Sequence, residues 1–238
     1  MSETSNLKLP LVAPSQAQKH VTVNEALARI DAVVQISAVS RSLATPPANP
    51  SEADTYLVAL GGTDAWLGAD GEIASFINGG WHFVSPVRGW RVWIDDEALN
   101  VSFDGAEWRA NVVAQAPSGA AMRGEIIEFD HVLTGGAGSE DTAVVIPAQT
   151  CVWGVTGRVL SEFTGGLSDW SLGVAGSDDR YGSGLGKGTG AWLRGLTGQP
   201  VTYYNDTPLR LTANGGSFSG GSVRLCINLM RFDLPEGV

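Results

Sequence analysis

Two short clusters of acidic side chains are the first candidates for chemistry in this sequence. Residues 95–97 read Asp-Asp-Glu between two apolar runs, and Asp178 and Asp179 stand in a glycine-rich stretch. Glycosidases use two carboxyl groups about 5 to 10 Å apart across a sugar ring. The pattern around residues 95–97 is typical of a solvated hairpin turn, so only the second cluster stays a candidate for sugar chemistry.

Aromatic and basic side chains surround the second cluster. Arg180 and Tyr181 follow it directly, and such a group can hydrogen-bond sugar hydroxyls and stack on a sugar ring. Turn chemistry explains the same residues about equally well. Two tryptophans flank the stretch from residue 177 to 190, which the glycine content predicts to be a long loop on a rigid scaffold. The predicted glycan-binding residues are Trp170, Asp178, Asp179, Arg180, Tyr181 and Trp192.

Other kinds of site find little support in the sequence. His20, His82 and His131 lack a second ligand at the spacing of a metal site. Residues 186–191 (GKGTGA) match a loose dinucleotide pattern, but the glycine-rich stretch that follows does not favour the required helix. No nucleophile elbow lies between a strand and a helix. We expect no catalytic residues, no metal and no cofactor, and therefore not an enzyme.

Composition and charge narrow the class of protein further. Of the 238 residues, 43% are hydrophobic and 17% charged, and 31 are glycine, which favours short strands joined by tight turns. The net charge of −10 disfavours binding to nucleic acid or to an anionic membrane. No apolar run approaches a membrane span, and residues 1–4 show no export signal. Cys151 and Cys226 are expected to be buried small residues rather than a disulfide.

Three segments follow from the patterns along the chain. Residues 1–44 form a predicted anchoring segment, with a helix at 22–38 that opens on a capping box at residues 22–25. Its apolar stripe comprises residues 26, 27, 30, 33 and 34, with Glu25, Arg29 and Asp31 largely off the stripe. A lone helix cannot bury such a stripe, so it must dock on the next segment or on another copy of the chain.

Residues 45–118 are predicted to be a small β domain rich in tryptophan and glycine. Residues 76–81 (FINGGW) resemble residues 103–108 (FDGAEW), and each copy places a turn between two aromatic residues. Residues 119–238 alternate strand-like runs with turn clusters, which predicts an antiparallel β-sandwich of jelly-roll type. Trp153 lies in an apolar run and is expected to be buried. The fold class is therefore mainly β, with an N-terminal helix, a small β-meander and a C-terminal sandwich.

The sequence from Leu9 to Leu27, LPLVAPSQAQKHVTVNEAL, carries a specific resemblance. It resembles the start of an uncharacterised domain family found in alphaproteobacterial prophages and gene transfer agents. The region up to Trp108 is similar to the rest of that domain, and the C-terminal segment looks like the sandwich that often follows it. The family implies a head spike or tail fibre that binds host capsular polysaccharide. The predicted particle-anchoring residues are Gln16, Gln18, Lys19, His20 and Asn24.

The resemblance also implies partners and location. We expect other virion proteins as partners, a homo-oligomer (a trimer, or a pentamer at a capsid vertex) and host surface polysaccharide as ligand, at the surface of a phage-like particle. Two alternatives remain open. A polysaccharide-degrading spike would draw its carboxylates from Asp169, Asp178, Asp179 and Asp206, and a purely architectural connector would bury the sandwich loops against other subunits.

Overall fold

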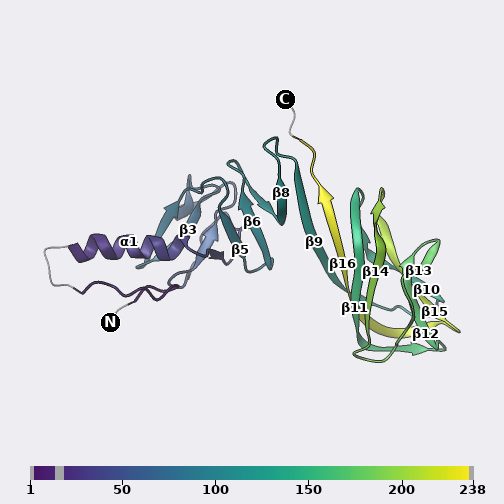
Figure 1. The fold of residues 1–238 in the computed structure, drawn as a ribbon. Coiled ribbons are helices and arrows are strands. Elements are labelled where there is room, and N and C mark those ends of the chain that lie inside the picture. Colours follow the sequence, from purple (N-terminus) through teal and green to yellow (C-terminus); the bar gives the residue numbers. More distant parts are fainter. Residues whose placement is uncertain (1–2, 14–18, 236–238) are drawn as a thin grey trace. The chain divides into compact units, whose positions relative to one another are not determined.

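The computed structural model describes residues 3–13 and 19–235, and the chain folds into two compact units, residues 1–112 and 113–238. The first unit holds the helix and several short strands (Figure 1). Its elements are α1 (Lys19–Val33), β1 (Ser37–Ala38), β2 (Thr55–Leu57), the 3-10 helix η1 (Asp64–Trp66), β3 (Ile73–Ile77), β4 (Gly80–Val84), β5 (Arg91–Ile94), β6 (Leu99–Phe103) and β7 (Trp108–Ala110).

Two small sheets make up the β-structure of the first unit. One has the order β2-β3-β4, and the other has the order β1-β5-β6-β7, in which β1 runs parallel to β5. One apolar cluster, around Tyr56 and Trp66, lies on the sheet of β2 to β4, and a second cluster joins the two sheets, with Ile73 from β3 and Ile94 from β5. The single meander expected from the sequence is therefore a pair of sheets.

The internal repeat corresponds to two aromatic hairpins. Phe76 on β3 is the register partner of Trp81 on β4, and their ring centroids lie 5.2 Å apart. Phe103 on β6 and Trp108 on β7 are paired in the same way, also with 5.2 Å between ring centroids. Asn78, with φ 53°, forms the first turn together with the glycine after it, as a tight two-residue hairpin requires.

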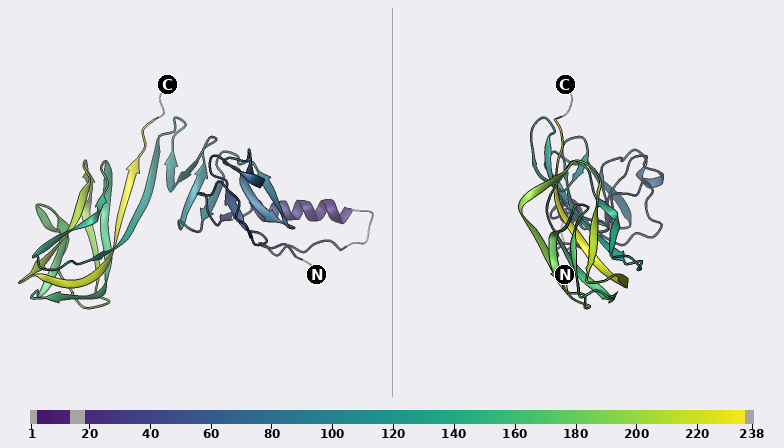
Figure 2. Two further views of the ribbon diagram at one scale, coloured as in Figure 1. Left: turned by 180° about the vertical axis from the view of Figure 1, so that it is seen from behind. Right: turned by 90° about the vertical axis from the view of Figure 1, so that its right-hand side faces the viewer.

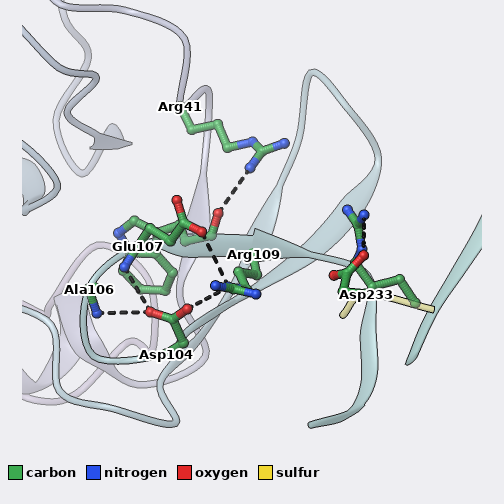
Figure 3. Close-up of polar contacts among 8 residues, drawn as sticks. Arg41, Asp104, Ala106, Glu107, Arg109 and Asp233 are labelled. Carbon is green, nitrogen blue, oxygen red and sulfur yellow. Dashed lines mark hydrogen bonds and ion pairs between the residues drawn. The ribbon is translucent and has the colours of Figure 1, made fainter. Parts of the chain in front are cut away.

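The second hairpin closes differently. The Asp104 carboxylate accepts hydrogen bonds from the backbone N–H groups of Ala106 and Glu107, and it pairs with the Arg109 guanidinium (Figure 3). Burial opposes ionisation of Asp104, but these hydrogen bonds and Arg109 outweigh it and lower the pKa of the carboxyl. The turn is thus held by one ionised side chain in place of the Asn-Gly geometry of the first copy.

The helix differs from the sequence prediction in its bounds. Residues 22–25 lie inside α1, so the capping box does not stand at its start. The helical stretch ends at Val33 instead of residue 38, because Gln35 adopts a positive φ of 57° and the next residues extend into β1. Ile36 and Ala38 are buried there in the apolar cluster. Their burial favours the extended conformation over a longer helix.

The buried face of α1 also differs from the prediction. Asp31, expected on the polar side, is 5% exposed, whereas Ile30, expected in the apolar stripe, is 46% exposed. The segment that covers α1 is the extended stretch at residues 3–12, which runs alongside the helix (Figure 1). Since that stretch carries polar groups, Asp31 is buried against it, whereas Glu25 and Arg29 stay exposed.

Asp31 is the centre of this contact. Its carboxylate accepts hydrogen bonds from the Thr4 hydroxyl at 2.7 Å and from the backbone N–H groups of Asn6 and Leu7 at 2.8 and 2.6 Å. Burial alone would raise the pKa of Asp31, but these hydrogen bonds outweigh burial and lower it. The ionised carboxylate therefore ties the N-terminal segment to the helix.

The second unit is an antiparallel β-sandwich, as predicted (Figure 2). One sheet has the order β10-β15-β12-β13, and the other has the order β14-β11-β16-β9-β8. The strands are β8 (Val112–Gln115), β9 (Ala121–Val132), β10 (Ser139–Ile146), β11 (Thr150–Gly165), β12 (Asp169–Val174), β13 (Ser177–Leu185), β14 (Trp192–Tyr203), β15 (Thr207–Asn214) and β16 (Phe218–Phe232).

The core of the sandwich forms from the inward residues of both sheets. Phe163 contacts Trp170 and Phe218, with ring centroids 5.1 and 5.7 Å apart. The edge strands β13 and β14 approach so closely that a Cβ on Gly195 would stand 2.0 Å from the carbonyl oxygen of Tyr181. Glycine at residue 195 is therefore a steric requirement of this fold.

Two burial predictions in this unit are wrong. Trp153 is 51% exposed, because the register of β11 shifts between Val152 and Gly154 and turns its side chain outward. Cys151 and Cys226 are half-buried instead of buried, and both are free thiols. Along the β11–β16 pair, Cys151 faces Met230, so the two cysteines are not neighbours. In the described part of the chain, no helix is long and apolar enough to cross a membrane.

The Asp31 contact makes a testable prediction. Asp31→Asn should weaken docking of residues 3–12 by about 1–3 kcal/mol, because a buried acceptor of three hydrogen bonds loses its charge. The folded-state pKa is lowered, so the stabilisation is present at neutral pH and disappears as the pH falls below about 4. Amide hydrogen exchange at Asn6 and Leu7 should thus be faster in the variant at pH 7. Equal exchange rates in both proteins would contradict the assignment.

Candidate functional site

Two of the predicted glycan-binding residues belong to the core of the sandwich. Trp170 is 1% exposed, and its indole N–H donates to the carbonyl oxygen of Gly186 at 3.0 Å. Tyr181 is 2% exposed, and its hydroxyl shares a 2.7 Å hydrogen bond with the hydroxyl of Tyr203. Burial and this hydrogen bond raise the pKa of Tyr181, so the phenol stays neutral. Neither ring faces solvent where a ligand could stack on it.

Asp178, Asp179 and Arg180 do lie on the surface, but not in a loop. The stretch predicted to be a loop at residues 177–190 contains strand β13, which pairs with β12 through two register shifts. Gly182 and Gly184, with positive φ values of 148° and 63°, accommodate this irregular strand. The glycines that suggested a loop are therefore part of an irregular edge strand.

Of the predicted set, Trp192 has the surface expected of a ligand-binding aromatic residue. It begins β14, the edge strand of the five-stranded sheet, and 65% of its surface is exposed. The guanidinium carbon of Arg194 lies 6.0 Å from the centroid of its ring, at the distance of a cation–π contact.

The strand register brings further arginines beside Trp192. Arg158 on β11 is the partner of Trp192 on one side and of Arg224 on β16 on the other. Asp130 on β9 ends the row as the partner of Arg224. Because side chains alternate across a strand, all of these point to the solvent face of the sheet.

A second row lies two residues further along each strand. Arg194, Thr156, Cys226 and Glu128 are successive register partners across β14, β11, β16 and β9. We call the surface formed by Trp192, Arg194, Arg158, Thr156, Arg224 and Cys226 the arginine–tryptophan face. It surrounds a shallow depression of about 450 Å³.

The charges on this face are unevenly paired. Arg224 donates two hydrogen bonds to the Asp130 carboxylate, at 2.7 and 2.9 Å, and this contact lowers the pKa of Asp130. Arg158 donates to the carbonyl oxygen of Gly190 at 3.1 Å. Among the residues that the structure describes, no carboxylate lies within ion-pair distance of Arg158 or Arg194.

The thiol of Cys226 adds no charge to the face. It donates to a carboxylate oxygen of Glu128 at 3.4 Å. Burial raises the pKa of Cys226, and the contact with Glu128 raises it further, so the thiol is neutral near pH 7. The face therefore presents hydroxyl and thiol groups between its arginines.

Sequence reasoning missed the three arginines of the face. Arg158, Arg194 and Arg224 stand in different runs, at least 30 residues apart in sequence, with no local motif around any of them. Each alternates with inward apolar residues, which was the available signal for a solvent-facing side chain. Their convergence follows only from the pairing of β14, β11 and β16.

The predicted anchoring residues lie in or near the first unit. Gln16 and Gln18 are outside the described residues, and the side chain of Lys19 is not described. Asn24 exchanges two hydrogen bonds with the backbone of Val12, at 2.8 and 3.1 Å. His20 and Asn24 also line a cavity of about 750 Å³ between α1, the N-terminal segment and the sheet of β2 to β4. Two of the five residues are thus brought together there.

The remaining acidic clusters are engaged in structural contacts. Residues 95–98 connect β5 to β6, and Glu97 forms an ion pair with Arg41 through N–O distances of 2.7 and 2.8 Å. Asp206 accepts a backbone hydrogen bond from Ala148 at 2.8 Å. Within residues 3–13 and 19–235, no group of three or more metal-ligating side chains is placed to hold a metal ion.

Comparison with known protein families gives a match for part of the chain. Residues 23–109 match the family described as "Protein of unknown function (DUF2793)". This range includes the end of the N-terminal signature, from Val23 to Leu27, and the two aromatic hairpins. It agrees with the resemblance to an uncharacterised domain family. No curated protein matches the chain.

One solved structure shows a weak similarity. A chain of the structure titled "Cyanophage Pam1 capsid asymmetric unit" is 21% identical, with a TM-score of 0.34. The match covers 54% of this chain and 97% of that chain.

The assignment of Trp170 to the core can be tested directly. Trp170→Ala should lower the free energy of unfolding by about 3–5 kcal/mol, because it leaves a cavity beside Phe163. Trp192→Ala, on the solvent face, should change it by about 0.5 kcal/mol or less. Chemical denaturation of both variants measures the difference. A smaller loss for Trp170→Ala than for Trp192→Ala would contradict the assignment.

Proposed function

We propose that this chain is a non-enzymatic surface subunit of a phage-like particle, a spike or fibre of a gene transfer agent or prophage, that attaches to bacterial surface polysaccharide. The observation that carries the proposal is the exposed Trp192 ring beside hydrogen-bonding side chains on an open sheet face. Sugar rings stack their apolar faces on such aromatic surfaces. The sequence signature from residue 9 to 27 supports the link to phage-like particles.

Binding is favoured over hydrolysis by the state of the carboxyl groups. A glycosidase needs one carboxylic acid with a raised pKa to protonate the leaving group. In the described part of the second unit, the carboxyl groups with a displaced pKa, at Asp130, Glu140, Asp141 and Asp169, all have it lowered. For Asp169, named above as a candidate catalytic residue, hydrogen bonds from Asn214 and Ser168 lower the pKa.

The alternative function, a purely architectural connector, predicts a different role for the same surface. If the chain only joined other subunits, the exposed residues of the sandwich would be covered by them. An exposed tryptophan among arginines would then be a protein contact, and the purified chain would show no affinity for polysaccharide. Binding measurements on the isolated chain therefore separate the two functions.

The first unit would serve assembly. We propose that it joins the chain to other virion proteins and to further copies of itself, as a trimer or as a pentamer at a capsid vertex. On α1, Val23, Ile30 and the adjoining Val34 are each more than 40% exposed, and Leu27 lies between them. Their spacing of four, three and four residues is that of a coiled-coil seam. Several copies in one spike would add weak sugar contacts through effective concentration.

Removal of the Trp192 ring should weaken attachment. Trp192→Ala should reduce binding of the purified chain to capsulated cells about tenfold or more, since stacking is worth roughly 1.5 kcal/mol per contact and is multiplied by avidity. The measurement is a cell-binding isotherm with capsulated and acapsular strains.

The matched control is Trp153→Ala. Trp153 is also exposed on β11 but stands five residues from Arg158, the register partner of Trp192. It should keep the binding of the unmodified chain. Equal binding of the unmodified chain to both strains, or no loss with Trp192→Ala, would count against the proposed function.

The role of α1 predicts an oligomer that depends on its seam. Ile30→Glu should convert the oligomer to the 24.9 kDa single chain, because a charge would be buried at the centre of the helix contact. Sedimentation velocity measures the mass, and circular dichroism confirms that the fold is retained.

Arg29→Gln is the control for this change, since Arg29 is exposed on the same helix and pairs with Glu25 one turn away. It should leave the oligomer intact. A single-chain mass for the unmodified protein would refute self-association through α1.

A further inference from the structure

The arginine–tryptophan face carries positive charge on an acidic protein. The chain has a net charge of −10, yet Arg158, Arg194 and Arg224 stand on adjacent strands around one depression. Elsewhere in this unit an arginine meets a carboxylate on a neighbouring strand, as Arg210 meets Asp141 at 2.7 and 2.9 Å and Arg231 meets Glu125 at 2.7 Å. Among the residues that the structure describes, Arg158 and Arg194 of the face have no such carboxylate partner.

Like charges stand directly opposite each other in the face. Arg158 and Arg224 are register partners, an arrangement that destabilises an antiparallel pair. Asp130 neutralises Arg224, but Arg158 has only the carbonyl oxygen of Gly190, and Arg194 lies over Trp192. An anion placed in the depression would complete the charge pairing of Arg158 and Arg194.

The neighbouring groups define what kind of anion fits. Trp192 offers a flat exposed surface for the apolar face of a ring, and the Thr156 hydroxyl faces the same depression from β11. A guanidinium group binds a carboxylate through two parallel hydrogen bonds. Ring, hydroxyl groups and carboxylate occur together in an acidic sugar.

We propose that the arginine–tryptophan face binds the carboxylate of an acidic sugar, such as a uronic acid, in a bacterial surface polysaccharide. Arg158 and Arg194 hold the carboxylate, Trp192 stacks on the sugar ring, and Arg224 stays paired with Asp130. This inference rests on the proposed function and specifies its ligand. A nucleic acid strand could also stack on tryptophan beside arginine, and the test therefore includes a single-stranded DNA.

The test uses the full chain and defined polymers. Binding to alginate, polygalacturonate and hyaluronate is measured by biolayer interferometry, each beside its carboxyl-reduced form and beside oligo-dT. We expect binding to at least one native acidic polymer, a loss of about tenfold or more on carboxyl reduction, and further weakening as salt rises. No binding to any acidic polymer, equal binding to the reduced forms, or tighter binding to oligo-dT would overturn the proposal.

The variants assign the effect to the face. Arg158→Gln and Arg194→Gln should each weaken binding to the native acidic polymer about tenfold. Arg210→Gln, which removes one positive charge from the solvent side of the other sheet, should leave it unchanged. Equal losses in all three would show a general charge effect and overturn the site.

Cell binding separates this inference from the proposed function. If the chain binds capsulated cells through Trp192 but ignores the carboxyl groups of the polymers, attachment to polysaccharide stands and the acidic-sugar site fails. If the chain binds neither capsulated cells nor any polymer, the proposed function itself fails.

Discussion

The alternation of side chains along β11, β14 and β16 is the constraint on which the second unit depends. Val155 and Val159 of β11 face inward with Leu193 of β14 and Leu225 of β16, and all four are buried in the sandwich core. The same pleat sends every second residue to solvent. Once the core register is fixed, the positions of the arginine–tryptophan face are fixed with it, without any interaction among the surface side chains themselves.

This dependence explains why the face can tolerate charge repulsion. A one-residue slip would expose the core residues of these strands, so the buried apolar contacts hold the register firmly. Arg158 and Arg224 stand opposite each other because the core places them there. If the face binds a ligand as proposed, a geometry held in this way would lose little conformational entropy on binding.

In the first unit, one polar contact determines which residues of α1 are buried. The Asp31 carboxylate accepts hydrogen bonds from the Thr4 hydroxyl and two backbone N–H groups, and this buries the Asp31 side of α1. The apolar side, with Ile30 and Val34, is left exposed as a consequence. The exposed apolar residues of the helix are therefore the ones available to the assembly contact proposed above.

The sequence by itself determined the class of structure and much of its local detail. Strand-like runs separated by turn residues identified the sandwich, and the repeat of an aromatic residue, a turn and Trp identified two hairpins, because these signals act between near neighbours. It could not place Asp31 inside or Ile30 outside, since that choice depends on residues 3–12 returning along the helix. Nor could it bring Arg158, Trp192 and Arg224 together, because long-range strand pairing decides which distant residues become neighbours. Both outcomes depend on the tertiary structure for the same reason. Which side chains are buried or become neighbours is decided by contacts between segments far apart in the chain, and the sequence of one segment does not contain that information.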